Sequence, residues 1–265
     1  VLHQPAHQVS YSPDGTLLAT CNDNNSVDVW DPRTGDLLTV LSVPEQRITT
    51  TAFSPDGTVL VGGDWSGSVH VWDTRTWEER TPLTGEQQAG WQYVESLRFS
   101  PDGGLLAGCS KNGLIRIWDM QTGGETATWR GKNGTLRTID FSPDGRFLAA
   151  GDVRGLITIL NPRTGAKLVT LAGHEKMVNS VDFHPDGTRL ASGSKDGTVR
   201  IWDTLTWAEL ATLTGHQYGV AALAFSHDGT RLVSGSTRSL RSWVTRPRSV
   251  LARDRRAARA RAEHL

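Results

Sequence analysis

Six aspartates recur along this chain at a nearly constant spacing, and carboxylates are common general acids and bases in enzymes. They are Asp14, Asp56, Asp102, Asp144, Asp186 and Asp228. Each one precedes a glycine, mostly in the phrase Ser-Pro-Asp-Gly. A catalytic pair needs two carboxylates that converge on one bond, whereas these six are spread evenly along the sequence. We therefore interpret each aspartate as the cap of its own turn.

Histidine and cysteine could form a metal site, but their spacing does not favour one. His3 and His7 are the only histidines at helical spacing, and they lie in a segment that we predict to be extended. Cys21 and Cys109 are the only cysteines, which excludes a four-thiolate zinc site and a disulfide-stapled scaffold. They occupy the same position in two separate repeats, so we expect inert core thiols beyond disulfide reach.

Motifs for phosphate binding and for a serine nucleophile are absent from the sequence. The pairs Gly62-Gly63 and Gly103-Gly104 lie at predicted strand or turn positions, not between a strand and a helix. A nucleophile elbow does not occur. We predict that the chain is not an enzyme and that it needs no cofactor, no metal and no small-molecule substrate.

The same aspartates mark an internal repeat. The aromatic residues that open each phrase are 42 residues apart, with one interval of 46. A second phrase, Trp-Asp or a variant, follows at a matching distance: Trp30-Asp31, Trp72-Asp73, Trp118-Asp119, Leu160-Asn161, Trp202-Asp203 and Trp243-Val244. Two independent markers with one period indicate a repeat architecture.

Each repeat contains four short predicted strands. In the fifth unit, apolar residues alternate before the turn Pro185-Asp186-Gly187, and Asp196-Gly197 forms a second tight turn. No segment of the repeats shows a sustained 3.6-residue apolar period. One small sheet cannot cover both of its faces, so neighbouring sheets must stack around an axis. The prediction is an all-β fold, a β-propeller of about six four-stranded antiparallel blades.

The best unit, Gly173-His174 with Ser192, Asp196 and Trp202-Asp203, resembles the WD-repeat (WD40) family, and the likeness covers roughly residues 5–254. The resemblance implies a hydrogen-bonded network of His174, Ser192, Asp196 and Trp202 inside the blade. Other units depart from it. The histidine position holds Pro44, Gly90 and Lys132 in units two to four, the tryptophan position holds Leu160 in unit four, and Thr237 lies near the aspartate position of unit six.

We place the propeller at residues 1–245. Its units lie near 5–41, 46–84, 92–130, 134–172, 176–214 and 218–254. Residues 246–265 are predicted to hold a degenerate last strand, with Val250-Leu251-Ala252 as the candidate, and a short basic C-terminal tail. Either six blades close the ring without a shared strand, or the chain is part of a longer, seven-bladed ring.

The charge is neutral overall but unevenly distributed. The segment 246–265 carries seven arginines against Asp254 and Glu263, so the rest of the chain is mildly acidic. The segment lacks interleaved aromatics and an apolar stripe, so we prefer a solvated tail over one that binds nucleic acid or an anionic membrane. No apolar run is long enough to span a membrane and no signal pattern occurs, and we therefore expect a soluble, cytoplasmic protein.

The ten tryptophans divide into groups. Trp30, Trp72, Trp118, Trp202 and Trp243 end third strands, and we expect these and Trp129 in the core. Trp77 and Trp207 replace a turn glycine, so we expect them to be half-exposed. Trp65 and Trp91, in a turn and in an insertion, are the functional candidates.

In the family that the chain resembles, one rim of the ring commonly receives protein partners. The matching positions here are Arg47, Thr49, Trp65, Tyr93, Glu95, Lys111, Arg137, Met177, Asn179 and Lys195. Trp, Tyr and Arg often anchor interfaces, and here they concentrate in units two to four. We predict that Arg47, Trp65, Tyr93 and Arg137 form the centre of a partner site.

These observations support a non-catalytic scaffold for protein–protein interaction. The alternative is a sensor or regulatory propeller of a larger signalling protein with a kinase or NTPase domain upstream. Fold alone does not decide between the two.

Overall fold

The computed structural model describes residues 6–22, 25–43, 46–83, 92–131 and 134–245, and these form six antiparallel sheets. The first three sheets are blade 1, with β1 (Ala6–Tyr11), β2 (Leu18–Asn22), β3 (Ser26–Trp30) and β4 (Leu37–Ser42); blade 2, with β5 (Ile48–Phe53), β6 (Val59–Asp64), β7 (Val69–Asp73) and β8 (Glu79–Leu83); and blade 3, with β9 (Val94–Phe99), β10 (Leu105–Ser110), β11 (Leu114–Asp119) and β12 (Glu125–Arg130). The other three are blade 4, with β13 (Leu136–Phe141), β14 (Leu148–Asp152), β15 (Ile157–Leu160) and β16 (Lys167–Leu171); blade 5, with β17 (Val178–Phe183), β18 (Arg189–Ser194), β19 (Val199–Asp203) and β20 (Glu209–Leu213); and blade 6, with β21 (Val220–Phe225), β22 (Arg231–Ser236) and β23 (Leu240–Val244).

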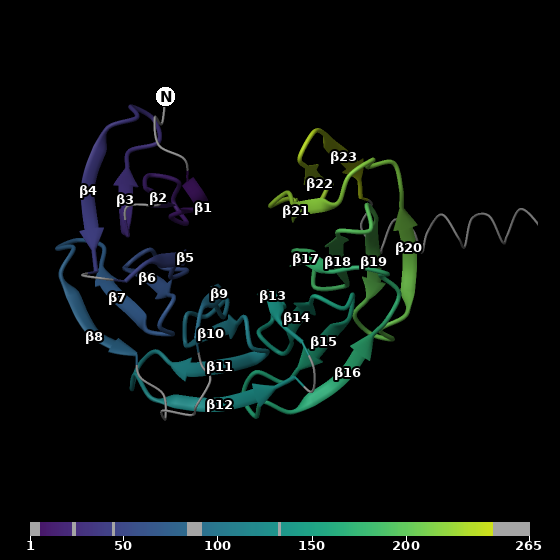
Figure 1. Cartoon of the computed structure of the whole chain (residues 1–265), viewed down its shortest axis with the longest axis horizontal. Helices are drawn as coiled ribbons and strands as arrows, with labels where there is room; N and C mark the ends of the chain where they lie inside the picture. Colours follow the sequence, from purple (N-terminus) through teal and green to yellow (C-terminus); the bar gives the residue numbers. More distant parts are fainter. Residues whose placement is uncertain (1–5, 23–24, 44–45, 84–91, 132–133, 246–265) are drawn as a thin grey trace, which may run out of the picture.

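The blades are arranged around a common axis, with the first strand of each blade innermost and the fourth outermost (Figure 1). Within every sheet, strands that are consecutive in the sequence are hydrogen-bonded neighbours. This confirms the β-propeller predicted from the repeat. The described residues contain no helix long and apolar enough to cross a bilayer.

Turn chemistry explains where the strands end. In the first turn of blade 5, Gly187 adopts the left-handed conformation with a φ of 70°, which glycine reaches without a steric penalty. The aspartates before such glycines fold back on their own turns. Asp14, for example, accepts hydrogen bonds from the Ser12 hydroxyl at 2.6 Å and from the Thr16 amide at 3.0 Å. The turn-cap interpretation is therefore correct for this residue.

The core lies between neighbouring blades. Val181, Phe183, Leu190 and Trp202 of blade 5 pack against Ile157 and Ile159 of blade 4, and all of them are buried. The other blade-to-blade boundaries hold equivalent clusters. Burial of this apolar surface, at roughly 25 cal/mol per Å², is the main stabilising contribution to the fold.

Polar contacts near the axis also link the blades. Asp140 on β13 accepts a hydrogen bond from the amide of Phe183 at 2.8 Å, and Asp182 on β17 accepts one from Phe225 at 2.6 Å. Burial raises the pKa of both carboxyls, and the charge of Arg98 on β9 opposes this shift. The two aspartates hold the first strands of three successive blades together.

The six described sheets form an open arc rather than a closed ring (Figure 1). The end faces are exposed where other blades are buried: Tyr11 in blade 1 is 59% exposed, whereas its counterpart Phe183 is 5% exposed. Leu240 in blade 6 is 77% exposed, and its counterpart Val199 is fully buried. One of the two predicted alternatives was a ring closed by six blades. That prediction is wrong for the described residues. The candidate last strand 250–252 and the arginine-rich segment lie outside them.

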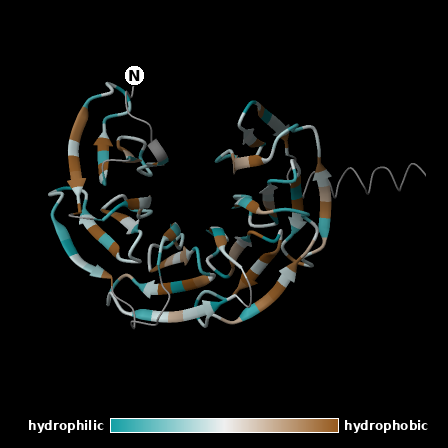
Figure 2. Cartoon of the chain, viewed as in Figure 1, coloured by the Kyte–Doolittle hydropathy of each residue, from teal (hydrophilic) through white to brown (hydrophobic). Residues whose placement is uncertain are grey.

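The outer strands are less covered than the inner ones. Figure 2 shows hydrophobic segments on outer strands such as β4 and β16 as well as inside the blades. On β4, Leu37, Leu38 and Val40 are each about half exposed. The other outer strands add single residues of this kind, such as Leu168 on β16 and Leu210 on β20, and exposed apolar residues in small numbers are normal on protein surfaces.

Candidate functional site

The predicted partner positions lie at one edge of the blades, where first strands begin and second strands end. Trp65 follows β6 directly and starts the turn into β7. Tyr93 precedes β9, and Lys111 follows β10. Two loops from blade 2 and two from blade 3 therefore meet at this edge, which we call the loop rim.

Four side chains of the loop rim form a continuous stack. The indole of Trp65 and the ring of Tyr93 are stacked at 5.4 Å between centroids with an interplanar angle of 22°. The Arg47 guanidinium lies 5.0 Å from the Trp65 centroid, and the Lys111 ammonium lies 4.6 Å from the Tyr93 centroid. Aromatic stacking contributes about 0.5–1.5 kcal/mol and an exposed cation–π contact about 0.5–1 kcal/mol. The four residues therefore hold one another in place as the Arg47–Trp65–Tyr93–Lys111 stack.

The backbone beneath the stack follows the same order. The Trp65 amide donates to the Arg47 carbonyl at 3.1 Å, the Tyr93 amide donates to the Trp65 carbonyl at 2.9 Å, and the Lys111 amide donates to the Tyr93 carbonyl at 3.1 Å. Tyr93 has a φ of 57°, in the left-handed region that aromatic residues rarely occupy. Local strain of this kind costs about 1–3 kcal/mol and clusters at functional sites.

Two members of the stack are exposed to solvent, and the other two are partly buried. Trp65 is 44% exposed and Lys111 is exposed, whereas Arg47 and Tyr93 are half-buried. An aromatic pair held rigidly with an exposed indole is the kind of anchor that interfaces use.

Arg137, which we predicted at the centre, does not join the stack. Its guanidinium forms an ion pair with Glu95 at 2.9 Å, with its side chain 39% exposed. Burial raises the pKa of Glu95, and the positive charges of Arg137 and Lys111 oppose that shift. The fourth member of the stack is Lys111 instead, because the tight turn after β10 places its side chain over Tyr93.

The other predicted rim residues mainly serve the structure. The Thr49 hydroxyl donates to the Gly63 carbonyl at 3.0 Å, and the Asn179 amide group donates to the Val220 carbonyl at 2.7 Å. The Met177 carbonyl accepts the amide of Lys195, whose side chain is exposed. Trp91 lies outside the described residues.

Blade 5 contains a continuous polar network that links the loop before its first strand to its second and third strands. Nδ1 of His174 lies 2.9 Å from the Asp196 carboxylate, and Nε2 lies 2.8 Å from the Ser192 hydroxyl, to which Trp202 Nε1 also donates at 2.9 Å. Burial lowers the pKa of His174 although Asp196 opposes the shift. Burial alone would raise the pKa of Asp196, but hydrogen bonds from Thr198 and His174 bring it to about 2. All four groups are satisfied inside the blade, so they stabilise it and are not available for chemistry.

Blades 6 and 2 also contain histidine networks; unit six keeps His216, Ser234 and Trp243 in its sequence, whereas the network of blade 2 was not predicted. In blade 6, Ser239 rather than Thr237 takes the aspartate's place, with its hydroxyl 2.9 Å from His216 Nδ1. In blade 2, His70 lies between Asp64 at 3.1 Å and Glu79 at 2.7 Å. In the sequence, the signal for the blade 2 network is Asp64 at the end of the second strand together with His70 in the third strand. Neither residue occupies a position that the repeat uses for its histidine or aspartate.

The remaining chemical candidates are the two cysteines and the groups that could bind a metal ion. Cys21 and Cys109 are free thiols in the core, and burial raises the pKa of both, for Cys21 to about 12. Across the described ranges, no group of three or more His, Cys, Asp or Glu side chains is arranged to hold a metal ion. Trp72, Trp118 and Trp202 are buried as predicted, whereas Trp30 and Trp243, in the two end blades, and Trp129 are half-buried.

Two family models match the chain. The model described as WD domain, G-beta repeat, matches residues 123–159, 165–203 and 207–243. The model described as nucleolar protein 10-like, N-terminal domain, a β-propeller domain, matches residues 3–133. Together they cover the chain from the first blade to the sixth. No curated protein matches the chain.

Proposed function

Because the chain belongs to the WD-repeat family of β-propellers, we propose that it is a non-catalytic scaffold that binds an acidic segment of a protein partner through its loop rim. The observation that carries this proposal is the Arg47–Trp65–Tyr93–Lys111 stack. WD-repeat propellers generally mediate protein–protein interactions, and the stack gives this propeller a specific anchor.

The arrangement of the stack supports an anionic partner. Each aromatic ring is in contact both with the other ring and with a cation of the chain itself. An incoming cation would therefore compete with Arg47 or Lys111. An acidic segment would instead meet two positive charges and the ring edges, which carry the positive part of the aromatic quadrupole.

The partner positions also support a role without catalysis. Of the ten residues predicted there, Glu95 alone is acidic, and it is paired with Arg137. General acid–base catalysis needs a titratable group within reach of a substrate, usually with a second group beside it. The loop rim offers rigid aromatic and basic groups, which suit binding.

Affinity capture from the native host, followed by mass spectrometry, tests the proposal with three baits. We expect the wild-type chain to recover a partner with an acidic contact segment, and the double variant Trp65→Ala, Tyr93→Ala to lose it. Tyr218→Ala is the matched control, because Tyr218 also lies on the loop rim with a single cation, Arg238, 5.0 Å from its ring. This control should retain the partner.

Charge gives a second, independent readout. Reversal of both cations, Arg47→Glu with Lys111→Glu, should abolish recovery, and wild-type binding should weaken as salt rises because exposed charges are screened. Equal recovery by the wild-type chain and the Trp65→Ala, Tyr93→Ala variant would refute the proposal.

We further propose that this interaction takes place in the cytoplasm. Both cysteines are free thiols in the core, as is usual in a reducing compartment, and this supports the location. Cell fractionation with an antibody to the chain tests it. Enrichment in nucleoli would contradict the proposal, and would agree with the similarity of residues 3–133 to the nucleolar protein 10-like domain.

A further inference from the structure

Blade 4 has lost the side chains that fill the outer side of blade 5. In blade 5, the space beside the fourth strand holds Trp202, Ser192, Arg200, Glu209 and Asp196. Since the repeat is 42 residues long, the same positions in blade 4 are Leu160, Ala150, Thr158, Lys167 and Arg154. The two largest side chains, those of Trp202 and Arg200, become small, and the two acidic residues become basic.

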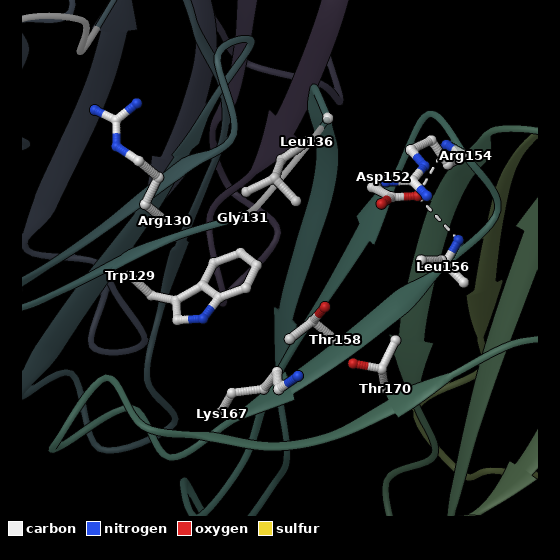
Figure 3. Close-up of a pocket in the computed structure, with 11 residues that line it drawn as sticks. Trp129, Arg130, Gly131, Leu136, Asp152, Arg154, Leu156, Thr158, Lys167 and Thr170 are labelled. Atoms are coloured by element: carbon white, nitrogen blue, oxygen red, sulfur yellow. Dashed lines mark hydrogen bonds between the residues drawn. The ribbon is translucent and has the colours of Figure 1, made fainter.

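The consequence is a cavity of about 250 Å³ between β12 of blade 3 and strands β14 to β16 of blade 4 (Figure 3). Polar lining residues come from four strands or their turns: Arg130, Asp152, Arg154, Thr158, Lys167 and Thr170. In Figure 3 the Lys167 amine and the hydroxyls of Thr158 and Thr170 gather on one side of the cavity, while the Arg130 side chain is directed away.

The charge of this cavity differs from that of its counterparts, in which a cation and a carboxylate balance each other. In blades 2, 3 and 5, a cation on the third strand faces a glutamate at the start of the fourth: His70 with Glu79, Arg116 with Glu125 and Arg200 with Glu209. Blade 4 has Thr158 and Lys167 at these positions. The cavity has three basic residues and one carboxylate, Asp152, which accepts the amides of Arg154 at 2.8 Å and Leu156 at 2.9 Å.

Trp129 forms the apolar wall of the cavity. A methyl group added to Gly173 in blade 5 would lie 3.1 Å from Cη2 of Trp202, and one added to the equivalent Gly131 would lie 3.2 Å from Cη2 of Trp129. An indole therefore lies under the same glycine in both blades, but in blade 4 it comes from the fourth strand of the preceding blade. Because Trp129 takes this place from the neighbouring blade, the interior of the cavity stays open beside the flat face of its indole.

We propose that this cavity binds a small phosphate monoester that carries a planar, aromatic group. The phosphate lies among Lys167, Thr158 and Thr170, with Arg154 across the cavity, and the aromatic group lies against Trp129. Without Arg130, Lys167 and Arg154 against Asp152 leave an excess of one positive charge, which favours an anion, and the phosphate oxygens accept hydrogen bonds from the ammonium and the hydroxyls. This site shares no residue with the Arg47–Trp65–Tyr93–Lys111 stack, and its test does not depend on the proposed partner.

Isothermal titration calorimetry with phenyl phosphate tests the proposal. We expect saturable binding at one site, and at least fivefold weaker binding of both inorganic phosphate and phenol. Lys167→Glu, which introduces the residue found in blade 5, should weaken binding of phenyl phosphate at least tenfold. Arg33→Glu is the control for the change of charge, because the Arg33 side chain is exposed in blade 1, and it should stay within twofold of wild type.

A second variant separates shape from charge. Thr158→Arg adds a positive charge but introduces the long side chain that fills this space in blade 5, so it should also weaken binding at least tenfold while the thermal unfolding of the chain stays the same. Three results would overturn the proposal: no saturable binding of phenyl phosphate, equal binding by Lys167→Glu and wild type, or equal affinity for phenyl phosphate and inorganic phosphate.

Discussion

Blades 4 and 5 have the same repeat length and share one apolar interface, yet they are completed in different ways. In blade 5, hydrogen bonds among His174, Ser192, Asp196 and Trp202 link the loop before the first strand to the second and third strands. Blade 4 has no such network among its described residues and contains a cavity lined by basic residues instead. Both blades nevertheless have four regular strands, and the first three strands of each carry buried apolar residues. The apolar faces between blades therefore suffice for the fold, and the polar network is a local addition.

The largest expected effect comes from giving blade 5 the residue of blade 4. Trp202→Leu removes a buried indole and the hydrogen bond to Ser192, so we expect a loss of about 3 kcal/mol in the free energy of unfolding. Chemical denaturation measures it. The matched change is Trp129→Leu on β12 of blade 3, whose indole faces blade 4. It should cost about half as much, because that indole is half-buried and belongs to no network like that of blade 5. An equal cost at the two positions would show that the blades do not differ in this way.

A smaller effect is expected for the pH dependence of the network. The pKa of His174 is lowered in the fold, chiefly by burial, so at mildly acidic pH the unfolded chain takes up a proton that the folded chain does not. Stability from this group is present above the unfolded pKa of about 6.5 and is lost as pH falls below it.

His174→Gln removes this titration but keeps a side chain that can donate and accept hydrogen bonds. We expect the stability gap between wild type and variant to shrink by about 1 kcal/mol between pH 7.5 and pH 5. Denaturation midpoints at the two pH values, with unchanged slopes, give the measurement. A gap that widened toward pH 5 would mean that His174 is protonated in the fold.

The repeat made the fold predictable because its markers occupy positions that the sheet geometry requires. The Asp-Gly turns and the third-strand Trp-Asp phrases recur at one period, so the strands could be placed around them. Deviations from the repeat were harder to interpret. The cavity of blade 4 depends on the position of the Trp129 indole beside Gly131. The sequence shows only that Leu160 is smaller than the tryptophan at this position in other blades.

The stack on the loop rim was partly predictable. Arg47, Trp65 and Tyr93 were expected together because their places in the repeat bring them to one edge. The choice of Lys111 over Arg137 depends on side-chain contacts, since Glu95 takes Arg137 into an ion pair. Such competition between partners is set by distances of a few ångströms, which spacing in a sequence does not define.

The smallest expected effect concerns the turn between the third and fourth strands, where blade 4 has Gly165 and blade 5 has Trp207. Both residues are left-handed, with φ values of 68° and 59°. Trp207 is half-buried, as predicted, and packs edge-on against Phe147 of blade 4 with centroids 5.1 Å apart. That contact offsets the strain of a tryptophan at positive φ.

Trp207→Gly removes both the contact and the strain, so we expect the free energy of unfolding to stay within about 1 kcal/mol of wild type. The reciprocal change, Gly165→Trp, should be more damaging, because its first side-chain carbon would lie 3.1 Å from the Thr128 carbonyl oxygen. Thermal unfolding of the two variants gives the comparison. If Trp207→Gly were the more damaging of the two, the edge-on contact would contribute more than the backbone strain costs, and blade 5 would depend on this turn as well as on its network.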